Sequence, residues 1–168
     1  AEFAVYPEYC ESDYYDVTYA YRLRWNDVAY EPGVLKAVAY KAGKRIGEAT
    51  MRTAGEPARL RLTPDRTRLS ASGEDLAYIL VEVLDGKGTL CPLAGNLVRF
   101  EIDGPAEIAG IGNGNPLSLE LFQDESHELF HGKAMLILRT LEGQNGRIRV
   151  TARAEGLKDG RAQLQARR

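Results

Sequence analysis

The sequence has few of the residues that usually carry out chemistry or hold a chain in a membrane. It contains 168 residues but only two cysteines, two histidines and one tryptophan. Its 22 basic and 24 acidic side chains nearly cancel, giving a formal net charge of −2. Bulk charge therefore does not favour binding to nucleic acid or to a charged membrane surface. No apolar run approaches the roughly 20 residues that span a bilayer, so membrane insertion is not expected.

The two cysteines are too few for a fold held together by disulfides. Cys10 and Cys91 lie far apart in the sequence, in what we interpret as different domains. A disulfide between them is therefore not expected, and the two thiols do not indicate a redox compartment.

Short strands dominate the pattern of the sequence. From Asp75 onward, apolar residues occupy every second position, as expected for a strand that buries one face. Asp85-Gly-Lys-Gly88 then supplies the residues of a tight turn. The alternating positions are Ala77, Ile79, Val81 and Val83 in this run, and Leu60, Leu62, Val98, Phe100, Ile102, Ala134, Leu136, Leu138, Ile148, Val150, Ala152, Ala162 and Leu164 elsewhere.

Short strands divided by turns predict an all-β chain whose main domain is an immunoglobulin-like antiparallel β-sandwich. Gly55-Glu-Pro57 is the expected joint, because proline forces extended geometry on the residue before it. Residues 56–168 then hold about seven strands, enough for one complete sandwich, and Glu107–Ile111 is a candidate for a further strand. Residues 1–55 hold fewer, and we predict a partial second β-sandwich, the C-terminal part of a domain. Its expected strands are Phe3–Tyr6, Tyr19–Trp25, Val34–Tyr40 and Arg45–Thr53.

The strand that begins near Asp75 also has apolar residues on its second face. Tyr78, Leu80 and Leu84 stand where a solvated face would carry polar side chains. We therefore predict that these three residues form a domain interface.

His127-Glu-Leu-Phe-His131 matches the H-E-x-x-H pattern of zinc proteases, in which a helix places two imidazoles one turn apart. Gly132-Lys133 would stop such a helix at once, and no third histidine is present to complete the ligand set. We interpret the motif as a loop or single helical turn with two exposed histidines. The sequence predicts no metal site and no other cofactor.

Other catalytic patterns are equally weak. Gly110-Ile-Gly-Asn-Gly114 is followed by Asn115-Pro116 rather than a helix, so a tight turn with positive φ explains it better than a nucleotide site. A glycosidase dyad needs two acids fixed across a cleft, which a sandwich with short loops does not favour. No Gly-x-Ser-x-Gly elbow occurs. We predict that this chain has no active site of its own.

Aromatic residues crowd the first forty positions. Exposed rings can stack on sugars, so Tyr14, Tyr15 and Tyr19 are candidates for carbohydrate binding. Tyrosine is equally common in strands and buried interfaces, which is the simpler interpretation. Trp25 is expected in a core.

Several strings together resemble one family. Trp25-Asn-Asp-Val-Ala-Tyr-Glu-Pro-Gly33 and Arg52-Thr-Ala-Gly-Glu-Pro57 look like the end of the domain that follows the catalytic barrel in bacterial glycoside hydrolase family 2 enzymes, chiefly β-galactosidases. Leu76–Asp85, Ala109–Pro116 and Phe130-His-Gly-Lys133 are similar to the C-terminal immunoglobulin-like domain of the same proteins.

The resemblance implies a non-catalytic accessory piece of a larger exo-acting, retaining β-galactosidase. Such enzymes use two glutamates on a barrel of about 250 residues, so no catalytic residue is transferred to this chain. The implied partners are the catalytic barrel of the parent and, through an oligomer contact, further copies. The resemblance also implies an extracytoplasmic location in a bacterium, in the periplasm, secreted or on the cell surface. Two alternatives stay open: a carbohydrate-binding or cell-surface immunoglobulin-like module, and a metal hydrolase built on His127, Glu128 and His131.

Overall fold

The computed structural model of the chain describes residues 28–168, which form eleven strands and no helix. This part of the chain therefore contains no helix that could cross a membrane. The chain divides into two compact units, one that ends at Ala49 and one that runs from Thr50 to Arg168. The predicted joint at Gly55-Glu-Pro57 lies a few residues beyond this division.

The described part of the first unit is a two-stranded hairpin of β1 (Val34–Lys41) and β2 (Lys44–Arg52), which continues into the second unit. Both turn residues have left-handed backbone, with φ of 50° at Ala42 and 75° at Gly43. This is the type I′ geometry that matches the twist of a tight hairpin. The strands predicted at 34–40 and 45–53 are confirmed, while those at 3–6 and 19–25, and Trp25, lie outside the described residues.

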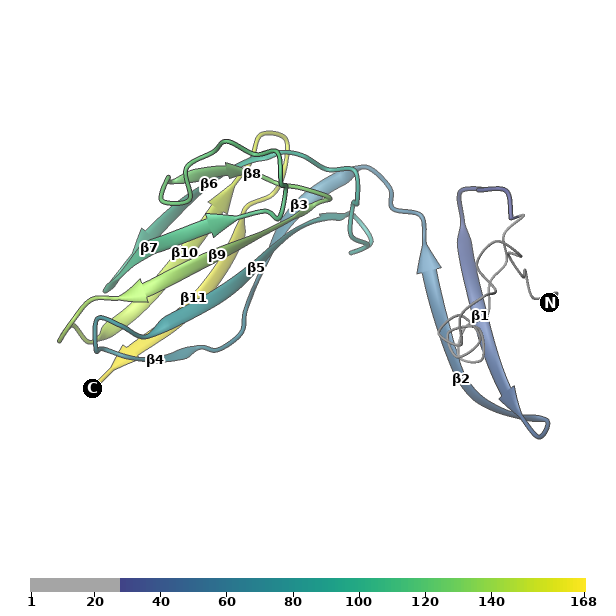
Figure 1. Cartoon of the computed structure of the whole chain (residues 1–168), viewed down its shortest axis with the longest axis horizontal. Coiled ribbons are helices and arrows are strands. Elements are labelled where there is room, and N and C mark those ends of the chain that lie inside the picture. The colour runs from purple at the N-terminus through teal and green to yellow at the C-terminus, as the bar shows by residue number, and fades with distance from the viewer. Residues whose placement is uncertain (1–27) are drawn as a thin grey trace, which may run out of the picture. The chain divides into compact units, whose positions relative to one another are not determined.

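The second unit consists of two antiparallel sheets stacked face to face (Figure 1). One sheet has the order β3 (Pro57–Pro64), β5 (Leu76–Asp85), β9 (Lys133–Thr140) and β7 (Ala106–Gly112). The other has the order β4 (Arg68–Ser70), β11 (Gly160–Arg167), β10 (Gly146–Arg153), β6 (Leu97–Asp103) and β8 (Ser126–Glu128). Only β4 runs parallel to its neighbour, β11. The predicted all-β sandwich is confirmed, and the order β3-β5-β9-β7 opposite β11-β10-β6 is that of constant-type immunoglobulin domains.

The core lies between the two sheets, where the alternating apolar residues meet. Ala77, Ile79, Val81 and Val83 of β5 are completely buried. Facing positions of the second sheet are equally inaccessible, as at Val98 and Ile148. Apolar surface removed from water is the main source of stability in such a sandwich. Of the predicted core positions, Ile102 and Ala162 pack only partly buried at its edge.

Gly132 joins β8 to β9 at a point where the backbone passes another loop closely. Its φ is 72°, its N–H donates to the Ala94 carbonyl, and its own carbonyl accepts from the N–H of Val83. A Cβ at this position would lie 2.3 Å from the Cys91 carbonyl oxygen. Only glycine therefore fits both the backbone angle and the space.

Two glycine substitutions separate these effects. Gly156 has the same φ of 72°, but nothing lies within 4 Å of its Cβ position. We expect Gly156→Ala to lower the free energy of unfolding by about 1 kcal/mol through backbone strain alone. Gly132→Ala should cost at least about 3 kcal/mol, because a steric clash with backbone is added. Urea unfolding measures both, and equal losses would contradict the close approach.

Candidate functional site

The two histidines of the H-E-x-x-H string do not share a helix. His127 lies in β8, opposite Val98 of β6, and is 1% exposed. His131 lies in the following turn with φ of 51°, and its Nδ1 is 3.2 Å from the Pro92 carbonyl oxygen. The prediction of two exposed histidines was wrong for His127, because β8 places this side chain on the inner face. Among residues 28–168, no three His, Cys, Asp or Glu side chains are grouped to hold a metal.

The glycine-rich string 110–114 ends in a turn, as predicted. Gly110 and Gly112 are part of β7, and Gly114 has φ of 76°. Asn113 closes the turn, because its Oδ1 accepts from the N–H of Asn115 and its Nδ2 donates to the Glu128 carbonyl. The chain then enters a loop with no helix start to hold a phosphate.

Glu120 organises the loop that follows β7. Its Oε1 accepts from the N–H of Glu128 at 2.9 Å, and its Oε2 accepts from the Ser118 hydroxyl at 3.0 Å. Oε2 is also 3.0 Å from Nδ1 of His127, which lies 3.0 Å from the Glu128 carbonyl as well. Both neighbours of Nδ1 are acceptors, so this nitrogen carries a hydrogen. The loop is thus tied to the edge strand β8 through one carboxylate.

A small hollow of about 250 Å³ lies beside this network. Its lining residues include Asn113, Glu120, Phe122 and His127. The carboxylate and the Nδ1 of the imidazole already bond within the loop. The arrangement therefore supports the conformation of the loop rather than presenting a reactive pair.

The same loop exposes apolar side chains. We call residues 117–122 the leucine loop. Its exposed fractions are 84% for Leu117, 97% for Leu119, 74% for Leu121 and 71% for Phe122. The backbone of Phe122 is held to β7, since its carbonyl accepts from the N–H of Ile111. An ordered loop that presents four large apolar side chains is a candidate contact surface.

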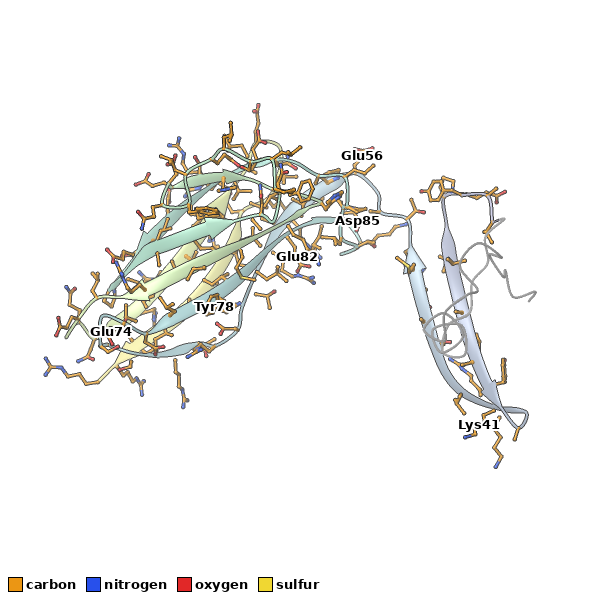
Figure 2. The ribbon with its side chains drawn as sticks, viewed as in Figure 1. Lys41, Glu56, Glu74, Tyr78, Glu82 and Asp85 are labelled. Carbon is orange, nitrogen blue, oxygen red and sulfur yellow. The ribbon has the colours of Figure 1, made fainter. Side chains whose placement is uncertain are left out.

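A second polar centre lies at the end of β5, where Figure 2 labels Asp85 close to Glu56. One oxygen of Asp85 accepts from the N–H of Gly55 at 2.9 Å, and the other accepts from Lys87 and Thr89. These N–H groups, that of Gly55 first, lower the pKa of Asp85. The segment before β3 is therefore fastened to the sandwich by a carboxylate.

Cys91 adds a contact to the same segment. It is a free, buried cysteine whose Sγ lies 3.6 Å from the Gly55 carbonyl oxygen. Burial, reinforced by the charges of Asp85 and Glu56, raises the pKa of this thiol. The protonated sulfur can donate to Gly55, so both the N–H and the carbonyl of Gly55 are held. Cys10, with which no disulfide is expected, lies outside the described residues.

The three residues predicted as a domain interface differ in exposure. Tyr78 is 40% exposed and Leu80 is partly buried, whereas Leu84 is 1% exposed. Figure 2 labels Tyr78 and Glu82 along β5. In the sequence of this strand, Glu82 stands between Leu80 and Leu84. Glu82 is paired with Arg61 at 2.6 Å. An ion pair thus interrupts the apolar row, and its role as an interface stays a prediction. The candidate sugar-binding residues Tyr14, Tyr15 and Tyr19 lie outside the described residues.

Comparison with protein families identifies the sandwich. A family model described as glycoside hydrolase family 2 C-terminal domain 5 matches residues 60–163. The chain belongs to this family. A second model, for a domain of unknown function (DUF4982), matches residues 11–47. The family 2 resemblance predicted from the sequence is therefore confirmed, and the domain it names corresponds to β3–β11.

Several relatives share both parts of the chain. A β-galactosidase, BoGH2A of Bacteroides ovatus, is 46% identical over 83% of this chain. A β-glucuronidase of Formosa agariphila is 34% identical over the same share. A solved glycosyl hydrolase family 2 member from Bacteroides cellulosilyticus superposes with a TM-score of 0.80 at 40% identity, over 84% of this chain. The chain spans only 16%, 14% and 18% of these three proteins, respectively.

Sequence reasoning missed Glu120 and the leucine loop of this family 2 domain. The string Leu117-Ser-Leu-Glu-Leu121 alternates like a strand but forms none. The sequence feature that could have indicated the leucine loop is the placement of three leucines next to Asn115-Pro116, outside any predicted strand. The bond from Glu120 to β8 could not be read from spacing.

We expect Glu120→Ala to loosen the leucine loop. The change removes the acceptor for the Glu128 N–H and one of the two acceptors beside His127 Nδ1, which should lower the free energy of unfolding by about 1–3 kcal/mol. Urea unfolding and hydrogen exchange of the amides of residues 113–125 measure the effect. Glu125→Ala is the control, because this exposed side chain makes no hydrogen bond in the described structure. Unchanged exchange in Glu120→Ala would contradict the assignment.

The lowered pKa of Asp85 predicts acid sensitivity. The ordinary value is 3.8, and the folded value is lower, so the carboxylate stabilises the fold above about pH 4. This stabilisation is lost as the pH falls through the folded pKa. Asp85→Asn should therefore be less stable than the native chain at pH 7 and lose less stability on going from pH 5 to pH 2. Urea unfolding across this range tests it, with Asp124→Asn expected to behave as the native chain; a native acid response in Asp85→Asn would refute the prediction.

Proposed function

We propose that this chain is a non-catalytic C-terminal accessory region of a bacterial glycoside hydrolase family 2 enzyme of the β-galactosidase type. Its role is to support the catalytic barrel that hydrolyses glycosidic bonds. The name of the 46% identical relative and the small share of that relative covered by the chain support this proposal. A barrel of about 250 residues exceeds the chain, so catalysis resides in another part of the parent.

The leucine loop is the observation that carries the proposal. Fully burying a leucine or phenylalanine side chain contributes about 1.5–3 kcal/mol, so exposing four of them forgoes considerable stability. The polar network around Glu120 nevertheless holds the loop in one conformation. A preformed apolar surface loses little entropy when it docks, which favours a contact with another domain of the same polypeptide. We assign the catalytic barrel as that partner.

The carboxylates of the sandwich do not fit the alternative of an active site. A retaining glycosidase places two carboxyl groups about 5–5.5 Å apart across a cleft, free to meet a sugar. Glu82, Asp85 and Glu120 are each already bonded within the domain. The roles predicted for Tyr78 and Leu80, the oligomeric contact and the extracytoplasmic location stay predictions.

The proposal is tested by activity and by stability of the parent. The 168-residue chain alone should not hydrolyse 4-nitrophenyl β-galactoside, whereas the parent enzyme should. In the parent, Leu119→Asp should lower the inactivation temperature of the catalytic activity, because a buried contact with the barrel that contributes about 2 kcal/mol or more is lost.

Leu93→Asp provides a matched control, since Leu93 is 94% exposed and lies outside the leucine loop. It should leave the inactivation temperature of the parent unchanged. Turnover by the isolated chain would refute the accessory role. Equal effects of the two substitutions would refute the assigned contact.

A further inference from the structure

The outer face of the five-stranded sheet is rich in arginine. Strict alternation along β10 and β11 turns apolar side chains inward and polar ones outward. We call the outward positions of β4, β11, β10, β6 and β8 the arginine face. Its arginines are Arg68, Arg99, Arg147, Arg149, Arg153, Arg161 and Arg167.

The strand register places these side chains in rows across the sheet. Arg147 lies opposite Gln165, which lies opposite Arg68. Arg149 lies between Asp103 and Gln163, and Arg153 lies opposite Arg99. Neighbouring strands are about 4.8 Å apart, and alternate residues along a strand are about 6.7 Å apart. The face is therefore a regular array of donors rather than a scatter of charges.

The arginine face is positively charged although the whole chain carries −2. Glu101, Asp103, Glu128, Glu155 and Asp159 are the acidic residues on or beside it, fewer than its seven arginines. Arg149 pairs with Asp103, Arg153 pairs with Glu101 and Asp159, and Arg161 lies 3.8 Å from the same Asp159 carboxylate. Arg68, Arg99, Arg147 and Arg167 have no ion pair in the described structure. Their guanidinium groups are free to bind an external anion.

A hollow of about 400 Å³ lies at one end of this face, where β6 begins and β10 ends. Its lining residues include Arg99, Arg153, Asn96 and Glu155. It thus combines cationic donors, an amide and an acceptor. This mixture suits a ligand that carries both carboxylate and hydroxyl groups.

We propose that the arginine face binds an acidic polysaccharide. Carboxylates of the polymer pair with the free guanidinium groups, for which the planar fork of arginine provides bidentate geometry. Hydroxyl groups of the sugars bond to the side chains of Gln163, Gln165 and Asn96. The hollow beside Arg99 accommodates one sugar unit, and the flat sheet carries the extended chain.

Other polyanions fit this surface less well. Duplex DNA carries one charge per about 1.7 Å, so the interspersed carboxylates of the face would repel it. Single strands need aromatic stacking platforms, and the outward positions of these five strands include no aromatic residue. Leu97 is the one apolar side chain among them, which is too little for insertion into a lipid surface. A sparse polyanion rich in hydroxyl groups matches the mixture of charges.

Native gel electrophoresis of the 168-residue chain tests the proposal. Gels that contain polygalacturonate should retard the chain, and gels that contain neutral galactan should not. The double variant Arg68→Gln/Arg147→Gln should raise the dissociation constant for polygalacturonate about tenfold. Raising the salt concentration should weaken the binding as well, because these contacts are exposed.

The matched control removes two positive charges from the other sheet and its turn, in Arg59→Gln/Lys87→Gln. It should bind polygalacturonate within about twofold of the native chain, and circular dichroism should show both variants folded. No retardation by polygalacturonate would overturn the proposal, as would equal loss in the control. Tighter binding to duplex DNA or to phosphatidylserine vesicles would assign the face to another polyanion and overturn it too.

Discussion

The packing of two sheets against each other sets every other property of this domain. The long strands of the sandwich contribute alternate side chains to the shared apolar layer, such as Ile79 and Val81 from one sheet and Ile148 and Val150 from the other. A shift of one residue in any strand would move its apolar set to the solvent. The register is therefore fixed by burial, and with it the identity of every outward residue. The arginine face is as ordered as the core because the same alternation produces both.

The loops escape this constraint and are held by polar side chains instead. Asp85 binds the segment before β3, and Glu120 binds the loop between β7 and β8. Each carboxylate accepts several hydrogen bonds, so each fixes a stretch of backbone that strand pairing does not reach. This is why the leucine loop stays in place while its apolar side chains face water. The two carboxylates hold structure, and that use is incompatible with a carboxylate left free for catalysis.

The strands that pair with long apolar partners were predictable from the sequence, and the short ones were not. In β5 and β10 the alternation is long enough to identify the buried face, and the structure confirms it. β8 has three residues, and it becomes a strand because it pairs with β6 across the intervening loop. No local pattern signals that pairing, so His127 was expected in solvent. The Glu120 network was not predicted for the same reason, since it depends on a contact that only the fold brings about.

The same distinction explains why composition concealed the charged face. A net charge of −2 averages over the chain, whereas the β-sandwich sorts charge by side and by sheet. Arg147, Arg149 and Arg153 stand at alternate or nearby positions, which in a strand places them on one surface. The pattern was visible, but its meaning required the neighbouring strands, because Arg99 and Arg68 come from distant parts of the sequence. Near neutrality of a β-sandwich therefore does not exclude a strongly charged face, and the strand register, rather than the net charge, decides which anions such a domain can meet.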